Sequence, residues 1–276
     1  MTSTADTFPR QYARTQRFTL GEPRDLVVSP DAERLVFARS RGGSDPVNCL
    51  WVHDLRSGDE RLVADPRLLL DDDAGDDLPP EERARRERLR EMAGGVTGFA
   101  TDRAVTVAAF ALGGRLFVAD LAGDGGAREL DVAGPVFDPR PDPTGRHVAY
   151  VNGPALHVTP IDGGGSRVLA AEPEPSETVT WGSADFIAAE EMNRQRGFWW
   201  NTDGTALAVC RVDERDVQVW HIADPAQPGT PPTAVRYPAA GTANPDVTLH
   251  ICPLDGGDPT PVEWDRAART YLARVA

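Results

Sequence analysis

The chain has 276 residues, of which 40% are hydrophobic, and it carries a formal net charge of -14. This length accommodates one large domain or two small ones, and the apolar content excludes global disorder. The negative charge argues against nucleic acid as a partner, because phosphate binding needs a basic face.

All 29 basic residues are arginines. The absence of lysine excludes chemistry that depends on it, such as Schiff bases and the phosphate-binding P-loop. The three cysteines, Cys49, Cys210 and Cys252, are widely spaced and show no metal-ligand pattern. We therefore expect buried free thiols, no disulfide framework, no metal site and no cofactor.

The sequence also bears on location. The N-terminal residues lack the apolar core of a signal peptide. No apolar run approaches the length of a membrane-spanning helix. The sequence thus predicts a soluble, cytoplasmic protein without a membrane partner.

A loose internal repeat runs along the chain, and each unit reads as turn, strand, turn, strand. The first half of the unit is SPDAERLVFARS from Ser29, DPTGRHVAYVNG from Asp142 and NTDGTALAVCRV from Asn201, with FATDRAVTVAAFA from Phe99 as a degenerate candidate. The second half is LWVHDL from Leu50, LFVADLAGDGG from Leu116, LHVTPIDGGG from Leu156 and LHICPLDGG from Leu249.

The composition of this repeat predicts an all-β fold. Asp-Gly and Pro-Asp pairs supply tight reversals, and β-branched or aromatic residues fill the strands. The 26 Gly and 24 Pro residues favour many turns in the same way. Short strands in recurring four-stranded units are typical of a β-propeller, although a sandwich or barrel is the alternative.

One segment breaks the β pattern. Residues 78–92 read LPPEERARRERLREM, with prolines at a helix start and Gly94-Gly95 after the end. We expect a helical insertion at about 79–93. Because it is almost uniformly charged, we expect that it cannot bury a face in a core; it is either a solvent-exposed helix held by Glu and Arg pairs or a projecting arm. The acidic run before it, from Leu68, reads as a loop.

The last residues, EWDRAARTYLARVA from Glu263, read as the start of another strand. A propeller must close its ring, because an open blade edge presents unpaired backbone groups. Four recognisable units are too few for a large ring that carries such insertions. We therefore expect residues 1–276 to form an incomplete β-propeller of four-stranded blades, and the chain to be a fragment or the product of a truncated gene.

Glu190 and Glu191 form the candidate binding site. Neighbouring side chains diverge on a helix or strand, so the two carboxylates can converge on one cation only where the backbone is irregular. The flanking sequence fits a brief helical insertion closed by Gly197. Such a pair could accept charge-assisted hydrogen bonds from the α-ammonium group of a peptide, whose pKa is near 8. A solvated acidic pair is the alternative.

A family resemblance weights these alternatives. The strings EEM, GFWWNTDG, CRVDE, VWHIADP and RYPAAGTANPDV follow in this order between Ala184 and Val247. This set resembles the N-terminal propeller of the dipeptidyl peptidase IV group, within the prolyl oligopeptidase family of serine peptidases. The helical segment followed by GGVTGFATD is similar to bacterial members, and weaker similarity extends through much of the chain.

The resemblance implies a function. Members pair an eight-bladed propeller with a C-terminal α/β-hydrolase domain and remove N-terminal dipeptides, commonly after Pro or Ala. Their double Glu anchors the substrate's ammonium group, and this role falls on Glu190 and Glu191. Members also place a propeller arginine near the substrate carbonyl. The segment from Arg83 to Arg90 offers several candidates without a means of choosing, and a surface ion-pair role is expected for most of them.

The departures from the family pattern concern catalysis. The chain has no G-x-S-x-G nucleophile elbow, since Val168 stands where the last Gly of the GGGSR turn would be. The five histidines lie in strand-like contexts without signs of a triad. The family's Ser-Pro-Asp-Gly turn is altered to Asn-Thr-Asp-Gly at 201–204, which keeps Asp-Gly.

We therefore expect the substrate-selecting propeller portion of a serine-type dipeptidyl peptidase, with no catalytic residues and with the C-terminal hydrolase domain absent. Its expected partners are a peptide with a free N-terminus and, in a full-length protein, that hydrolase domain. A non-enzymatic β-propeller that binds a partner or acts as a scaffold is the alternative.

Overall fold

The computed structural model describes residues 6–70, 78, 80–88 and 90–275. The chain divides into two compact units. The first comprises the residues up to Asn152 together with Val158–Arg167, and the second comprises Gly153–His157 together with the residues from Val168 onward.

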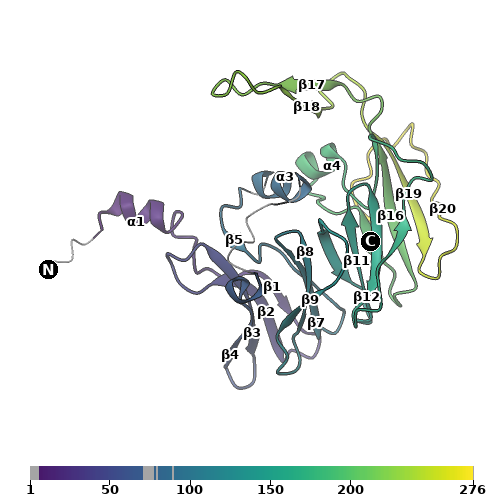
Figure 1. The fold of residues 1–276 in the computed structure, drawn as a ribbon. Coiled ribbons are helices and arrows are strands. Elements are labelled where there is room, and N and C mark those ends of the chain that lie inside the picture. Colours follow the sequence, from purple (N-terminus) through teal and green to yellow (C-terminus); the bar gives the residue numbers. More distant parts are fainter. Residues whose placement is uncertain (1–5, 71–77, 79, 89, 276) are drawn as a thin grey trace. The chain divides into compact units, whose positions relative to one another are not determined.

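Most of the chain forms four-stranded antiparallel sheets in chain order (Figure 1). The first contains β1 (Arg24–Val28), β2 (Arg34–Ser40), β3 (Val47–Asp54) and β4 (Glu60–Ala64), with β5 (Gly94–Gly95) parallel to β3. The second contains β6 (Ala100–Thr101), β7 (Val107–Leu112), β8 (Arg115–Asp120) and β9 (Ala127–Leu130). The third contains β10 (Phe137–Pro141), β11 (His147–Asn152), β12 (Ala155–Pro160) and β13 (Arg167–Ala170).

The fourth sheet is more elaborate. Its strand order is β14 (Val179–Trp181), β16 (Ala206–Asp213), β19 (Asp246–Pro253) and β20 (Thr260–Pro261), and β15 (Phe198–Trp200) also pairs with β16. A separate hairpin of β17 (Val219–Ile222) and β18 (Thr233–Arg236) is inserted between β16 and β19. Recurring four-stranded meanders of this kind are propeller blades, so the expected all-β propeller architecture is confirmed.

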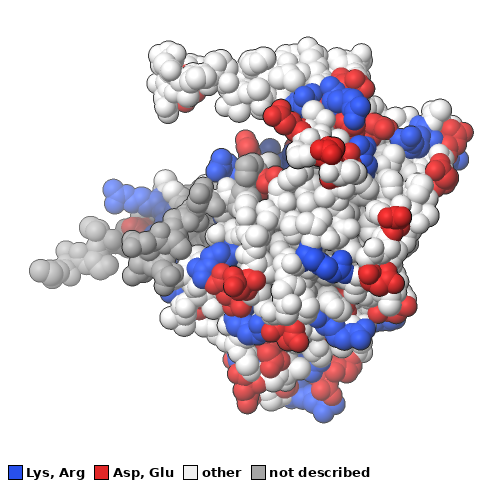
Figure 2. Space-filling view, turned by 45° about the vertical axis from the view of Figure 1, so that its right-hand side comes forward, with Lys and Arg blue, Asp and Glu red and all other residues white. Residues whose placement is uncertain are grey.

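The surface mixes both signs of charge. Figure 2 shows aspartate and glutamate side chains interspersed with arginines on the face in view. Several charged side chains of the protein are paired, as in the contacts of Arg39 with Glu60 and of Arg67 with Asp45, each at 2.6 Å. On this face, the negative charge of the chain is therefore spread out.

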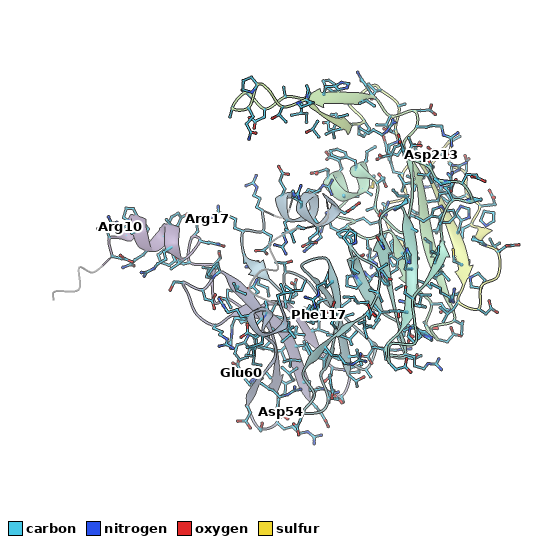
Figure 3. The ribbon with its side chains drawn as sticks, in the orientation of Figure 1. Arg10, Arg17, Asp54, Glu60, Phe117 and Asp213 are labelled. Carbon is cyan, nitrogen blue, oxygen red and sulfur yellow. The ribbon has the colours of Figure 1, made fainter. Side chains whose placement is uncertain are left out.

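The core lies between neighbouring sheets, so that both faces of the second sheet are buried. In the first unit, side chains of the first and second sheets form one buried cluster that includes Val36, Leu50, Phe110 and Phe117. The rings of Phe110 and Phe117 are stacked, with centroids 5.6 Å apart. Phe117 lies among the strands in Figure 3. In the second unit, a smaller cluster centres on Cys210.

The same turn precedes the second strand in all four sheets. The first residue of the turn donates its backbone N–H to the carbonyl of the residue five positions later. The side-chain oxygen of the first residue accepts the backbone N–H of that later residue. The backbone bonds run from Ser29 to Arg34 (2.9 Å), Asp102 to Val107 (3.1 Å), Asp142 to His147 (2.8 Å) and Asn201 to Ala206 (2.9 Å). The side-chain bonds of these pairs measure 2.9, 2.8, 2.7 and 3.1 Å. The predicted repeat is thus confirmed, including its degenerate copy.

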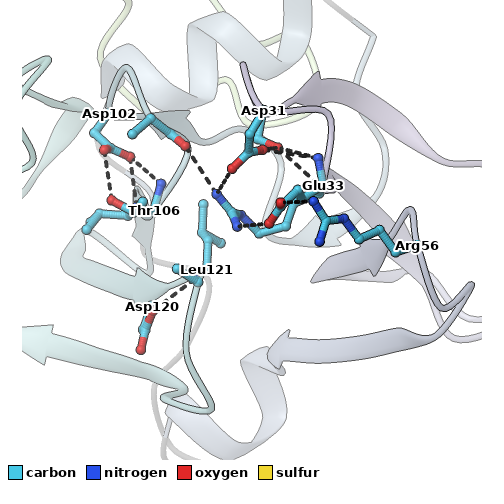
Figure 4. A network of polar contacts seen from close by, with 12 residues as sticks. Asp31, Glu33, Arg56, Asp102, Thr106, Asp120 and Leu121 are labelled. Carbon is cyan, nitrogen blue, oxygen red and sulfur yellow. Dashed lines mark hydrogen bonds and ion pairs between the residues drawn. The ribbon is translucent and has the colours of Figure 1, made fainter.

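Figure 4 shows two of these turns. The Asp102 carboxylate accepts the backbone amide and the hydroxyl of Thr106, at 2.6 and 2.9 Å. Asp31 accepts the amide of Glu33 at 3.1 Å, and Glu33 is paired with Arg56. A polar side chain that fixes its own turn in this way explains why short polar strings mark the blades in the sequence.

The predicted helical insertion is present as α3 (Pro80–Arg88), with the expected pairs of Glu and Arg. It is partly covered rather than fully exposed: the exposed side-chain fractions are 12% for Glu82, 18% for Arg85 and 13% for Arg86, whereas Arg83 and Glu87 are exposed. Glu82 accepts hydrogen bonds from both arginines at 2.7–2.8 Å. Burial opposes ionisation of Glu82, yet these bonds outweigh it and hold the pKa of the carboxyl below its usual value. A charged helix can be covered when its charges satisfy one another.

Three other expectations can be compared with the structure. The acidic run begins in α2 (Pro66–Leu69), and most of it, residues 71–77, lies outside the described residues. The expected strand after Glu263 was wrong, because residues 264–275 form a turn and irregular chain. This segment instead packs Trp264, Leu272 and Val275 onto the Cys210 cluster. A further short helix, α1 (Phe8–Arg14), precedes the first sheet.

The state of the cysteines and the character of the helices can also be compared with the expectations. The expectation of buried free thiols is confirmed for Cys49, Cys210 and Cys252. None of the helices in the described part of the chain has the length and apolar character needed to cross a membrane. The cytoplasmic location stays a prediction.

Candidate functional site

The candidate site lies on a loop that interrupts the first strand of the fourth sheet. Both β14 and β15 pair with β16: Trp181 is opposite Arg211, and Phe198 is opposite Val209. Cys210 lies between these pairings. Residues 182–197 therefore leave the sheet and return to it at almost the same point, as in an Ω-loop.

The neck of this loop is held by Cys210. The Cys210 amide donates to the carbonyl of Gly197 at 2.8 Å, and its carbonyl accepts the amide of Gly182 at 2.9 Å. A Cβ atom on Gly197 would lie 2.4 Å from the backbone C and O atoms of Ser183. Only glycine fits there, because the two ends of the loop touch.

The loop contains α4 (Phe186–Glu191). The helix begins at the N-cap Asp185, whose carboxylate accepts the Ala188 amide at 3.0 Å. It ends after Glu191, where Met192 donates to the Ala188 carbonyl and Asn193 has a left-handed φ of 51°. The predicted helical insertion is confirmed, but Gly197 does not close it. Asn193 does, because asparagine tolerates this conformation.

Glu190 and Glu191 are the last two residues of α4, and both are exposed. The C-terminal end of a helix carries partial negative charge, so two carboxylates there repel it. The last turn of α4 contains no basic residue. The helix end therefore presents two negative charges to a cation that approaches from solvent.

An ion pair lies beneath α4. Arg194 Nη2 donates to Asp185 Oδ2 at 2.8 Å, and the exposed side-chain fractions are only 5% and 7%. Arg194 also donates through Nη1 to the Arg196 carbonyl at 2.9 Å and through Nε to the Leu272 carbonyl at 3.0 Å. Its backbone amide donates to the Ala188 carbonyl at 3.0 Å.

Aromatic side chains border the loop. Trp199 and Trp200 are half-buried. The Trp199 ring centroid lies 5.3 Å from the guanidinium carbon of Arg196. At the start of α4, Phe186 meets Tyr237 edge-on, with centroids 5.1 Å apart and planes at 78°. The helix that contains the two glutamates of EEM is thus in contact with the tyrosine of the RYP string.

A second charged group supports the strand that carries the loop. Arg211 binds Glu172 in a bidentate manner, with Nε and Nη2 distances of 2.7 and 2.9 Å. Glu172 also accepts the Trp181 indole N–H at 2.9 Å. The hydrogen bonds from Arg211 outweigh the effect of burial and hold the pKa of Glu172 below its usual value. On the same strand, Asp213 ends β16 (Figure 3).

The sequence singled out Glu190 and Glu191 but missed the residues that shape their loop. Asp185 gave a usable signal, because an aspartate just before an apolar helix start is a good N-cap. The contacts of Arg194 with Asp185 and Leu272 left no signal in the sequence, since these partners lie 9 and 78 residues away along the chain. The candidate arginines of α3 include Arg85 and Arg86, whose contacts with Glu82 agree with the expected ion-pair role.

The described residues also bear on metal and acid–base chemistry. Within them, no group of three or more His, Cys, Asp or Glu side chains is placed to hold a metal ion. His147 contacts Asp142 through Nδ1 at 3.0 Å. The same carboxylate accepts the His147 amide and the Thr144 hydroxyl, so this contact belongs to the turn of the third sheet.

Comparison with known proteins gives consistent matches. A family model described as the dipeptidyl peptidase IV (DPP IV) N-terminal region matches residues 113–276, more than half of the chain. Dipeptidyl peptidase 8 of Homo sapiens is 34% identical over 79 residues, which cover 25% of this chain and 9% of that protein. A Schizosaccharomyces pombe protein named as a dipeptidyl aminopeptidase is 27% identical over 123 residues, covering 41% of this chain and 15% of that protein.

The fold also matches a solved structure. The crystal structure of Porphyromonas gingivalis dipeptidyl peptidase 4 superimposes with a TM-score of 0.63 at 16% identity, and the match covers 96% of this chain and 36% of that one. At this identity the likeness concerns the fold. The chain thus spans about a third of this structure, and its matches span smaller shares of the curated relatives.

Proposed function

Because the chain belongs to the family of dipeptidyl peptidase IV N-terminal regions, we propose that it is the substrate-selecting propeller portion of a serine-type dipeptidyl peptidase. In this proposal, Glu190 and Glu191 hold the free amino end of a peptide. The bond-breaking step belongs to a C-terminal hydrolase domain with a Ser-His-Asp triad, carried elsewhere in the full-length protein.

The observation that carries the proposal is the placement of the two carboxylates. They end a helix whose last turn lacks any basic residue, on a loop that interrupts a blade strand. An ammonium group there gains from both carboxylates and from the negative end of the helix. A chain extended or acetylated at its N-terminus has no such charge, so the site would select free amino ends.

A binding experiment tests this proposal. The ligand is a short Ala-Pro peptide with a free amino group, and the N-acetylated peptide is the comparison. We expect measurable binding of the first by calorimetry and little of the second. Glu191→Gln and Glu190→Gln should each weaken binding about tenfold or more, since a hydrogen bond to a charged group contributes roughly 1.5–3 kcal/mol.

Glu177→Gln is the matched control, because Glu177 is also an exposed glutamate of the same unit. Affinity should also fall as the pH rises through about 8, where the peptide ammonium loses its proton. Glu191→Gln should leave the melting temperature unchanged or slightly raise it, because the Glu191 carboxylate repels the negative end of the helix. Equal binding of the free and acetylated peptides would contradict the proposal.

The second candidate function is a non-enzymatic propeller that binds a partner through its surface. It is favoured if the free-amino peptide does not bind. A reading frame downstream of Ala276 that encodes G-x-S-x-G would favour the peptidase, and the chain alone should not hydrolyse a chromogenic dipeptide substrate.

A further inference from the structure

The buried ion pair beneath α4 connects the two ends of the segment that carries the candidate site. Asp185 precedes the helix and Arg194 follows it, and their side chains meet at 2.8 Å with almost no exposure. Burying two charges costs several kcal/mol of solvation each, so such a pair is weak evidence for stability alone. Its position at the ends of α4 calls for another explanation.

Each member of the pair fixes one end of the helix through Ala188. Asp185 Oδ1 accepts the Ala188 amide, and the Arg194 amide donates to the Ala188 carbonyl, both at 3.0 Å. The two carboxylate oxygens of Asp185 therefore have separate roles, since one caps the helix and the other binds the arginine. The pair and Ala188 form a closed ring of contacts around α4.

The guanidinium of Arg194 is anchored on all sides. Its three nitrogens donate to Asp185, to the Arg196 carbonyl and to the Leu272 carbonyl. A planar fork is needed to reach three acceptors in these directions, and lysine cannot supply it. The arginine thus ties the helix to its own loop and to the segment that packs on the Cys210 cluster.

A helix of this length needs such an anchor. Six residues are too few to form a stable helix alone, since isolated helices shorter than about 12–15 residues are marginal in water. Glu190 and Glu191 are exposed, so the direction of their carboxylates depends on how firmly the backbone of α4 is held. If it moved, each binding event would include the entropic cost of ordering it.

We propose that Asp185 and Arg194 are positioning residues, whose buried ion pair holds α4 so that Glu190 and Glu191 face the incoming ammonium group together. This inference rests on the proposed function for the identity of the ligand. It concerns residues that do not touch the peptide and act through the helix.

Arg194→Lys is the central variant, because it keeps the positive charge and removes the fork. Asp185→Asn is the second variant, since it keeps a capping oxygen and removes the negative charge. The control is Leu207→Ala, which removes a fully buried side chain from β16 and destabilises the same unit. The three readouts are the melting temperature, hydrogen exchange of the α4 amides, and affinity for the free-amino Ala-Pro peptide.

For Arg194→Lys we expect α4 exchange to accelerate and affinity for the peptide to fall, each by about tenfold, the effect of losing one charged hydrogen bond. Asp185→Asn should produce the same changes in exchange and affinity. If Arg194→Lys does not fold, the Asp185→Asn result alone tests the positioning role. Leu207→Ala should lower the melting temperature while leaving affinity within about twofold. A purely structural pair would instead make affinity follow the melting temperature in all three variants.

The outcomes separate this inference from the proposed function. If Glu191→Gln weakens binding but Arg194→Lys and Asp185→Asn do not, the positioning role is overturned and the ammonium site stands. If the peptide does not bind even the unaltered chain, the proposed function fails, and exchange at α4 decides the inference. Unchanged exchange in both variants would overturn it, and faster exchange confined to α4 would support it.

Discussion

Replacing Gly197 by alanine should damage both the fold and the candidate site. The new methyl carbon would lie 2.4 Å from the carbonyl C and O atoms of Ser183 and 2.5 Å from the carbonyl carbon of Gly182. Non-bonded carbon atoms prefer separations of about 3.5–4.0 Å. The overlap therefore exceeds roughly 1 Å, and it is with backbone atoms that cannot rotate away.

The neck of the loop must open to relieve this overlap. Opening it strains the two hydrogen bonds that Cys210 makes with Gly182 and Gly197. Overpacking costs about 1–3 kcal/mol, and each weakened bond adds up to about 1 kcal/mol. We expect a loss of about 2–4 kcal/mol in the free energy of unfolding, equivalent to a fall in melting temperature of about 5–15 °C.

Urea denaturation followed by tryptophan fluorescence measures this loss. Gly229→Ala is the matched control, because no atom lies within 4 Å of a Cβ at that exposed position; its effect should stay within about 0.5 kcal/mol. The Gly197 variant should also bind the free-amino peptide more weakly. A Gly197→Ala protein as stable as the unaltered chain would refute the close approach of Gly197 to Gly182 and Ser183.

Three further predictions concern the rest of the chain. Glu172→Gln should destabilise the protein at neutral pH, because the bidentate bond from Arg211 keeps the pKa of Glu172 below its ordinary 4.5. The stability that this bond contributes is present above the pKa of Glu172 in the unfolded chain and is lost as the pH falls through its pKa in the folded protein, so the denaturation curves of variant and parent should converge in acid. Burial raises the pKa of the thiols of Cys49, Cys210 and Cys252 to about 11. A thiol reagent at neutral pH should therefore react with them quickly only after denaturant is added, and rapid labelling of the native protein would contradict their burial. Phe117→Ala should cost about 3–5 kcal/mol, because it empties a buried site stacked on Phe110; a change below about 1 kcal/mol in urea denaturation would argue against that core.

The sequence was most informative where structure is set over a few residues. The blade turns repeat because a polar side chain at Ser29, Asp102, Asp142 or Asn201 bonds to an amide five residues away, and such local chemistry leaves a visible string. The short helix before Gly197 was predictable for a similar reason. The charged helix α3 and its ion pairs were predicted, but the partial burial of Glu82, Arg85 and Arg86 was not, because it depends on the segments that cover them.

Features that depend on distant partners could not be predicted. Gly197 reads as an ordinary helix terminator until Gly182 and Ser183 are seen against it. Arg194 reads as one of two arginines in MNRQRG, and only the folded chain brings it to Asp185. Glu190 and Glu191 could be singled out from the sequence, but their support could not.

The hydrogen bond from Arg194 to the carbonyl of Leu272 has a consequence for the order in which the molecule is made. The two residues are 78 positions apart. At synthesis rates of about 5–20 residues per second, the arginine is translated roughly 4–16 s before its last acceptor exists. Blade turns can close as soon as they are made, whereas the α4 loop reaches its final anchoring only when the segment containing Leu272 has been added. The loop that carries the candidate site is therefore expected to mature late, after the strands that hold it.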